Sequence, residues 1–147
     1  EVWLNDQPCQ SMTPSKWRSK VGLLMAESQW WAEHVGEHFP QAYMELINEL
    51  GFDKEVLNWE IKRCSSGEKQ RLALLRLLQH KPEALLLDEP TASLDPASVE
   101  RVENLLAAYR QEHSATVIWV THDPLQIQRV GQRHFELSKG TLKESIL

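Results

Sequence analysis

The sequence predicts an α/β protein built on a parallel β-sheet, with a helical insertion in front of the strands that carry the chemistry. Three short apolar runs have the character of buried strands: VGLLM at 21–25, ALLL at 84–87 and ATVIWV at 115–120. Between the second and third runs, residues 97–112 place apolar side chains at helical spacing. Strands that alternate with helices in this way are typical of a parallel sheet.

The first 60 residues are expected to form short strands followed by helices. EVWLNDQP, residues 1–8, has the pattern of a short antiparallel strand and turn, and residues 14–20 read as a polar connection. After the strand at 21–25, residues 28–60 read as helical, with breaks at Pro40 and Gly51.

The segment CSSGEKQRLALLRLLQH predicts a serine-capped helix over about 66–80, which Pro82 stops. The continuous apolar run at 84–87 is expected of a parallel strand covered on both faces, and 115–120 of a second buried strand. A short helix, the strand-like stretch HFEL and a turn at 139–140 are predicted to follow.

Composition and charge limit the classes of protein to which the chain can belong. Its 147 residues are 41% hydrophobic and 25% charged, as in an ordinary globular domain. The formal net charge of −5 argues against nonspecific nucleic-acid binding, which needs a basic surface. No apolar run approaches the roughly 18 residues of a membrane span, and no secretory signal is present. Cys9 and Cys64 are expected to be free thiols.

Charged and polar side chains follow two of the predicted strands. Asp88 and Glu89 come directly after the run at 84–87, and His122 follows the run at 115–120. Because ligands bind at the carboxyl ends of parallel strands, these groups are expected to meet at one edge. Asp88 there can hold Mg²⁺, and Glu89 can orient a water for attack. The alternative is that Asp88 caps a loop and Glu89 is merely solvated.

Three segments, in order, carry a resemblance to a known family. CSSGEKQRLALLRL resembles the signature of the ATP-binding cassette (ABC) ATPases, ALLLDEPTASLD their Walker B strand and D-loop, and VIWVTHD their switch-histidine loop. The resemblance implies a partial P-loop NTPase fold (ABC ATPase), with a parallel β-sheet core and a helical subdomain insertion, as a single partial domain over 1–147. N-terminal strands and the Q-loop region would occupy 1–26, the helical subdomain with the signature 27–80, and the catalytic α/β core 81–147.

The resemblance also implies a role for each matching residue. Asp88 becomes the Mg²⁺ ligand, Glu89 the general base for the hydrolytic water, and His122 the sensor of the γ-phosphate. Asp95 becomes the D-loop acid that communicates across a dimer. The signature residues that would contact the ATP of the opposite subunit are Ser65, Ser66, Gly67 and Glu68.

The signature also has a physical reading. A serine, a glycine and free N–H groups at the start of a helix form an anion site, where Gly67 would let a phosphate approach closely. The plainer reading is an N-cap in which Ser65 or Ser66 pairs with Glu68. Both can hold together, because a cap is also an anion site.

The sequence departs from the family pattern in three places. No G-x-x-x-x-G-K-[ST] occurs in the 147 residues, so the phosphate cradle and its lysine are missing from them. With a start at Glu1, this indicates a cassette that lacks its N-terminal portion, and we expect these residues alone neither to bind ATP tightly nor to hydrolyse it. Ala26 stands where the family has the Q-loop glutamine, and whether Glu27 or Gln29 replaces it stays open. Cys64 and Ser66 alter the usual signature, which is expected to tune the site.

The predicted insertion contains two further motifs. Trp30 and Trp31 point about 100° apart on a helix, so one of them can belong to an exposed docking patch for a membrane subunit; the alternative buries both. His34, Glu37 and His38 match the zinc motif H-x-x-E-H, but Gly36 weakens the helix that this motif needs. No zinc is therefore expected.

The resemblance therefore implies the ATP-binding and hydrolysing subunit of an ABC transporter, using ATP and Mg²⁺. Its partners would be a transmembrane permease subunit and a second ABC ATPase subunit, at the cytoplasmic face of a bacterial cell membrane, with no nucleic acid. The motifs look most like small cassettes of the efflux type. The alternatives are a soluble ABC ATPase of DNA repair or translation and a degenerate cassette with a regulatory role.

Overall fold

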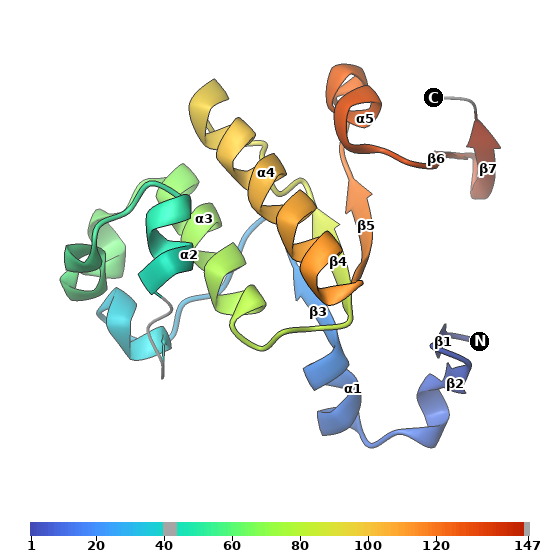
Figure 1. Cartoon of the computed structure of the whole chain (residues 1–147), viewed down its shortest axis with the longest axis horizontal. Helices are drawn as coiled ribbons and strands as arrows, with labels where there is room; N and C mark the ends of the chain where they lie inside the picture. The colour runs from blue at the N-terminus through green and yellow to red at the C-terminus, as the bar shows by residue number, and fades with distance from the viewer. Residues whose placement is uncertain (40–43, 146–147) are drawn as a thin grey trace.

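The computed structural model describes residues 1–39 and 44–145, and its centre is a parallel sheet of three strands. The strands are β3 (Val21–Leu24), β4 (Ala84–Asp88) and β5 (Thr116–Val120), in the order β3-β4-β5. Figure 1 shows them side by side and running in the same direction. The predicted parallel sheet is confirmed, because the two apolar runs that flank β4 pair with it on either side.

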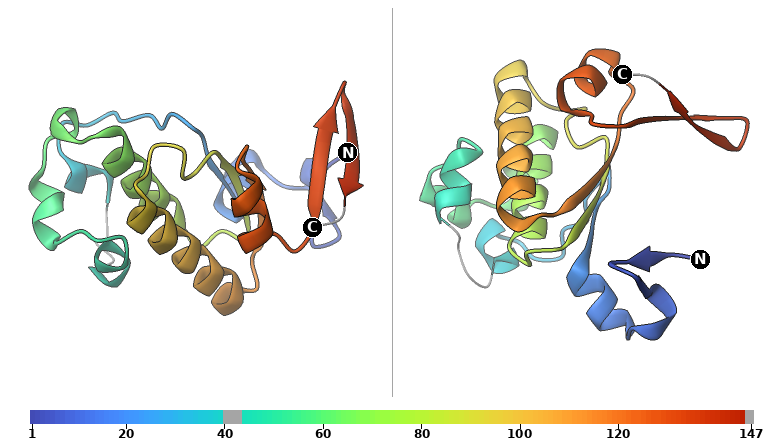
Figure 2. Two further views of the ribbon diagram at one scale, coloured as in Figure 1. Left: turned by 90° about the horizontal axis from the view of Figure 1, so that it is seen from above. Right: turned by 45° about the vertical axis from the view of Figure 1, so that its right-hand side comes forward.

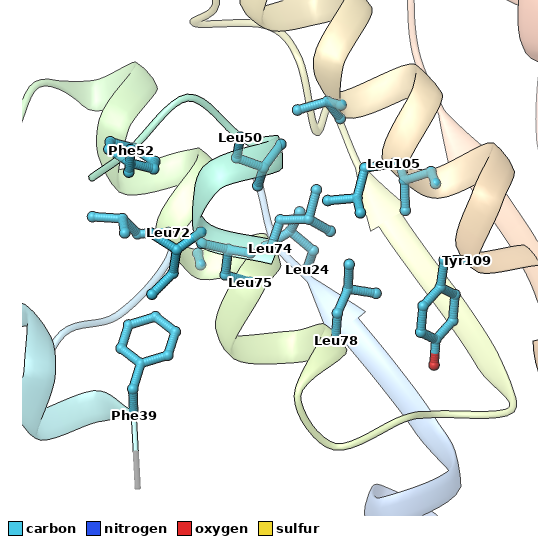
Figure 3. Close-up of a cluster of buried hydrophobic side chains, with 14 of the residues drawn as sticks. Leu24, Phe39, Leu50, Phe52, Leu72, Leu74, Leu75, Leu78, Leu105 and Tyr109 are labelled. Atoms are coloured by element: carbon cyan, nitrogen blue, oxygen red, sulfur yellow. The ribbon is translucent and has the colours of Figure 1, made fainter. Parts of the chain in front are cut away.

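Two helices pack on one face of this sheet and form the core with it. They are α3 (Ser66–Leu78) and α4 (Pro96–His113), both within two residues of their predicted bounds. The side chains that meet between helices and sheet (Figure 3) include Leu24 of β3, Leu74 and Leu78 of α3, and Leu105 and Tyr109 of α4. Burial of these leucines, worth roughly 1.5–3 kcal/mol each, is what holds the strand ends in place.

The opposite face of the sheet is open. Leu23, Leu86 and Ile118 form a cross-strand row on this face, and Leu23 and Ile118 are 58% and 57% exposed. The predictions that the run at 84–87 is covered on both faces and that 115–120 is a buried strand are therefore wrong. The physical reason is that α3 and α4 both lie on the same side of the sheet (Figure 2), so no helix among the described residues covers the other side.

The helical insertion between β3 and α3 is less regular than predicted. It contains α2 (Met44–Glu49) and the 3₁₀ turns η2 (Val35–His38), η3 (Lys54–Asn58) and η4 (Ile61–Arg63).

Of the predicted helix at 28–60, residues 28–34 form no helix, so this part of the prediction is wrong. The break at Pro40 lies outside the described residues. The break at Gly51 is confirmed. Gly51 has a φ of +79°, and the Phe52 N–H donates back to the Ile47 carbonyl at 3.1 Å, a common way to end a helix.

The N-terminal segment forms a hairpin and a short helix. The predicted antiparallel pair is present as β1 (Trp3–Leu4) and β2 (Gln7–Pro8), followed by the 3₁₀ turn η1 (Cys9–Ser11). The connection at 14–20 is a helix, α1 (Pro14–Lys20), and the sequence prediction missed it. Its start is fixed by Thr13, whose Oγ1 accepts a hydrogen bond from the Lys16 N–H at 3.3 Å, with proline at the first helical position.

The C-terminal segment leaves the sheet after β5. The short helix α5 (Pro124–Val130) leads to β6 (His134–Ser138) and β7 (Thr141–Ser145). The predicted strand HFEL is part of β6, but β6 pairs antiparallel with β7 and does not extend the parallel sheet. Figures 1 and 2 show this hairpin standing apart from the sheet. In the part of the chain that the structure describes, no helix is both long and apolar enough to cross a bilayer.

Candidate functional site

The ends of β4 and β5 bring a carboxylate and an imidazole together. Glu89 follows directly on β4, and its backbone N–H donates to the Val120 carbonyl at the end of β5, at 3.0 Å. His122 lies two residues beyond β5, and its Nε2 is 3.4 Å from Oε1 of Glu89. The prediction that the two strands deliver these groups to one edge is confirmed.

The two side chains differ in exposure. The Glu89 side chain is only 22% exposed, whereas the His122 side chain is 93% exposed. Oε1 of Glu89 is buried and makes no hydrogen bond with any residue that the structure describes. A partly buried carboxylate beside an exposed imidazole is an arrangement that suits proton transfer.

Glu89 also has an unusual backbone. Its φ of +46° lies in the left-handed region, which a residue with a side chain occupies only when its surroundings hold it there. The Glu89 carbonyl accepts from the Ala92 N–H at 3.2 Å, so the chain turns sharply after β4. The backbone therefore changes direction at Glu89, directly after the end of β4.

Asp88 is placed for a different task. It is the last residue of β4 and is exposed. The alternation of side chains along the strand sets it on the open face of the sheet, with Leu86. Its carboxylate is the kind of oxygen ligand that Mg²⁺ prefers, but within residues 1–39 and 44–145 no three or more His, Cys, Asp or Glu side chains are arranged so that they could hold a metal ion together. Asp88 thus fits a Mg²⁺ ion that takes its other ligands from phosphate and water.

The signature residues form the start of α3. Ser65 Oγ accepts from the Glu68 N–H at 3.2 Å, and the Glu68 carboxylate accepts from the Ser65 N–H at 2.8 Å. This reciprocal pair is a capping box, so the N-cap reading is confirmed. Ser65 and Ser66 are exposed, which leaves the helix start open to a ligand. The contact with ATP stays a prediction.

Gly67 is required by a close contact inside the chain. A Cβ at this position would lie 2.7 Å from the carbonyl oxygen of Ser93 and 3.3 Å from Cδ2 of Leu94. The signature therefore lies directly against the loop that follows β4. From the sequence we expected only that Gly67 lets a phosphate approach. Its contact with Ser93 could not be predicted, because it joins segments that are far apart in the chain.

Asp95 is the N-cap of α4. Its carboxylate accepts hydrogen bonds from the Ser98 backbone N–H at 3.0 Å and from the Ser98 hydroxyl at 2.6 Å. These bonds from Ser98 lower the pKa of Asp95, so the group stays ionised at neutral pH. Communication across a dimer stays a prediction for this residue.

A buried polar cluster, which the sequence analysis missed, joins the loop after β4 to α5. Gln126 is 2% exposed, and its Nε2 donates to Oγ1 of Thr91 and to Oε1 of Glu103, both at 2.9 Å. Glu103 also accepts from Arg129, whose Nη2 lies 2.8 Å from the same oxygen. These hydrogen bonds, first those from Arg129, lower the pKa of Glu103. No motif or spacing of polar residues in the sequence singles out Gln126, because its two neighbours in the chain are apolar.

A second polar and aromatic cluster lies on the insertion. Trp31 is 72% exposed, which contradicts the alternative that both tryptophans are buried, whereas Trp30 packs against the core. The guanidinium of Arg76 lies 4.5 Å and 4.7 Å from the centres of the Trp30 and Trp31 rings.

A surface pocket of about 410 Å³ opens beside these side chains, and its lining includes Leu24, Ser28, Trp31, His38, Arg76 and Gln79. Ala26, Glu27 and Gln29 are exposed on the segment that leads to this pocket.

The H-x-x-E-H motif does not form the helix that its zinc reading needs. His34 precedes the 3₁₀ turn η2, and its backbone N–H donates to Glu37 at 2.7 Å. His38 is 3% exposed, its Nε2 accepts from the Ala32 N–H at 3.3 Å, and its burial lowers the pKa of the ring. The two histidines therefore have separate structural roles.

Comparisons with known proteins point to one family. A family model described as "ABC transporter" matches residues 1–92. The phosphate import ATP-binding protein PstB of Aeropyrum pernix is 32% identical over 98% of this chain and 65% of its own length. The tungstate uptake system ATP-binding protein TupC of Peptoclostridium acidaminophilum is 39% identical over 71% of this chain and 49% of its own length. The chain thus spans about half to two thirds of the length of these relatives.

A protein of a lipoprotein-releasing system is also among the relatives. The lipoprotein-releasing system ATP-binding protein LolD of Treponema denticola is 44% identical over 56% of this chain and 36% of its own length.

Solved structures share the arrangement of the elements. A dimeric post-hydrolysis state of an ATP-binding cassette, bound to ADP and Pi, matches 97% of this chain and 72% of its own, with a TM-score of 0.80 at 21% identity. An ABC transporter in an inward-facing conformation matches 86% of this chain and 57% of its own, with a TM-score of 0.71 at 23% identity. At these identities the similarity establishes a common fold.

Proposed function

The chain belongs to the ABC transporter family and has the fold of its ATPases, and we propose that it acts in the ATP-hydrolysing subunit of a transporter. The observation that carries the proposal is the pair formed by Glu89 and His122 at the ends of β4 and β5. The alternative in which Glu89 is merely solvated fits poorly with a side chain that is four-fifths buried and lies beside His122.

In the proposed reaction, the oxygen of a water attacks the γ-phosphorus of ATP while the bond to the ADP oxygen breaks. The carboxylate of Glu89 accepts a proton of that water, and His122, exposed beside it, donates to an oxygen of the γ-phosphate. Asp88 would hold Mg²⁺, which supplies charge neutralisation for the phosphate oxygens.

A second subunit is proposed to complete the site. The capped start of α3, with the hydroxyl of Ser65 and free N–H groups, suits the phosphates of an ATP held mainly by another subunit. Because the 147 residues contain no phosphate-cradle motif, we propose that they do not hydrolyse ATP by themselves. Closure of the dimer on ATP would then drive the membrane partner.

The membrane partner is proposed to dock on the exposed side of the insertion. Trp31 and the pocket beside Arg76 present an aromatic surface next to a cation with no carboxylate partner among the described residues. We propose accordingly that the protein acts at the cytoplasmic face of a membrane. The relatives serve import as well as export, so efflux is only one of the directions that fit.

The proposal is tested in the complete gene product that contains these residues. Glu89→Gln should lower the rate of ATP hydrolysis by about 10²-fold or more and leave ATP binding intact, since only proton transfer is lost. Glu100→Gln, at an exposed position of α4, is the matched control and should keep the rate. Equal hydrolysis by both variants would remove Glu89 from the mechanism, and no hydrolysis by the unaltered protein would refute the function.

A further inference from the structure

We propose that Gln126 is a positioning residue that fixes the loop bearing Glu89 relative to the loop bearing His122. The proposal rests on the hydrolytic function proposed above. Thr91 lies two residues after Glu89, and Gln126 lies four residues after His122. Their side chains are hydrogen-bonded to each other, with 2.9 Å from Nε2 of Gln126 to Oγ1 of Thr91. One buried contact thus connects the two segments that carry the site.

The contact is sealed from water. Thr91 is 9% exposed and Gln126 is 2% exposed. A buried hydrogen-bonding group left without its partner costs about 1–3 kcal/mol, so the two side chains are held against each other. The loop and α5 therefore cannot separate without exposing or orphaning polar atoms.

The orientation of the Gln126 amide is fixed by its third partner. Glu103 of α4 can only accept hydrogen bonds when ionised, so the nitrogen of Gln126, and not its oxygen, must face it. Arg129 holds Glu103 in turn, with contacts of 2.8 Å and 3.2 Å to its two carboxylate oxygens. The Gln126 amide is thus anchored to α4, which is itself part of the core.

The loop needs such an anchor beyond its first residue. The Glu89 N–H donates to the Val120 carbonyl, and the other backbone bonds between β4 and α4 are local turns, Ala92 N–H to the Glu89 carbonyl and Leu94 N–H to the Thr91 carbonyl. The left-handed backbone of Glu89 persists only if its surroundings determine it. Thr91 supplies that constraint through Gln126, and a displacement of about 1 Å at a reacting group can cost roughly 10²-fold in rate.

The hydrogen bond between Gln126 and Thr91, called the tether from here on, is tested first by amide hydrogen exchange on the 147-residue chain. Gln126→Leu should raise exchange at Ala92 and Leu94 by about tenfold, equivalent to about 1.4 kcal/mol, and leave β4 unchanged. Gln128→Leu changes an exposed glutamine of the same helix and should have no effect. Thr91→Ser keeps the hydroxyl and should behave as the unaltered chain, whereas Thr91→Val should resemble Gln126→Leu. Equal exchange in Gln126→Leu and Gln128→Leu, or faster exchange spread evenly over the sheet, would overturn the tether.

The positioning role is tested by ATP hydrolysis in the complete gene product. Gln126→Leu should lower kcat by about 10²-fold with KM for ATP within about twofold, because nucleotide contacts are kept while Glu89 is displaced. Thr91→Ser should restore kcat relative to Thr91→Val. An unchanged kcat in Gln126→Leu would refute the role. An unaltered protein without hydrolysis would refute the proposed function instead, and the exchange experiment would still decide the tether.

Discussion

Gly67 shows how one position can serve a ligand and the fold together. The sequence suggested that its missing side chain lets a phosphate approach, and the structure adds that the Ser93 carbonyl oxygen lies only 2.7 Å from where a Cβ would be. The same glycine thereby lets the start of α3 pack against the loop that carries the carboxylates. A substitution here would act on both segments at once.

Gly67→Ala is expected to destabilise the chain by about 1–3 kcal/mol, because the added methyl meets a backbone oxygen that cannot turn away. Ser66→Ala, at the neighbouring exposed position, should stay within about 0.5 kcal/mol. Urea unfolding at equilibrium measures both. Equal stabilities would mean that the loop at Ser93 yields freely.

The site residues were predictable to different degrees. Asp88, Glu89 and His122 follow apolar runs, and the geometry of parallel strands is enough to bring such positions to one edge. The links from Gly67 to Ser93 and from Gln126 to Thr91 were not predictable, because each depends on how separate segments pack. Local spacing carries no information about such contacts.

At the scale of elements, the prediction held where local signals and packing agree. The helices α3 and α4 begin at strong caps, Ser65 and Asp95, and their apolar stripes face the sheet. α1 was missed although Thr13 and a following proline mark its start. Residues 28–34 were predicted helical but adopt an irregular path, since Trp30 packs against His38 and the core instead of along a helix. The boundaries proposed at 26 and 80 stay predictions.

One hydrogen bond ties α4 to the segment that leads into β4, and it should make stability depend on pH. The Tyr109 hydroxyl donates to the Pro82 carbonyl at 2.8 Å. Burial raises the pKa of Tyr109 from 10.0 to about 12, and the charge of Glu112 adds to this. Between these values the unfolded chain has lost the proton that the folded chain keeps, so stability is full below pH 10 and falls as pH rises toward 12.

Tyr109→Phe should therefore lower the free energy of unfolding by about 0.5–1.5 kcal/mol at pH 8. Above pH 10 the free energy of unfolding of this variant should fall less steeply with pH than that of the unaltered chain. Denaturant unfolding of both proteins at several pH values measures this difference. The titration of lysines affects both proteins alike, so it cancels in the comparison. The same slope in both proteins would mean that the phenol titrates normally in the fold.

For the whole molecule, the main feature is a sheet with one covered face. Leucines on the helix side, such as Leu85 and Leu87, are buried, whereas Leu23, Ile118 and Val120 are half exposed or more. An apolar surface of this kind on a folded chain is a site of contact with other molecules or with itself.

The two faces should respond differently to truncation. Ile118→Ala should cost less than about 1 kcal/mol, whereas Leu85→Ala should cost about 2–5 kcal/mol, because only the second leaves a cavity. Ile118→Ala should also reduce binding of the dye ANS to the folded chain. Unchanged dye binding would locate the apolar surface elsewhere, for example on the hairpin of β6 and β7.

The place of the insertion in the chain has a consequence for folding kinetics. Val21 and its partner Ala84 are 63 positions apart, whereas Ala84 and its partner Thr116 are 32 apart. Each doubling of the closed length adds about 0.6 kcal/mol of chain entropy. The unit of β4, α4 and β5 should thus assemble first, and β3 should join it late. Mutations in β3 are then expected to act mainly on the unfolding rate.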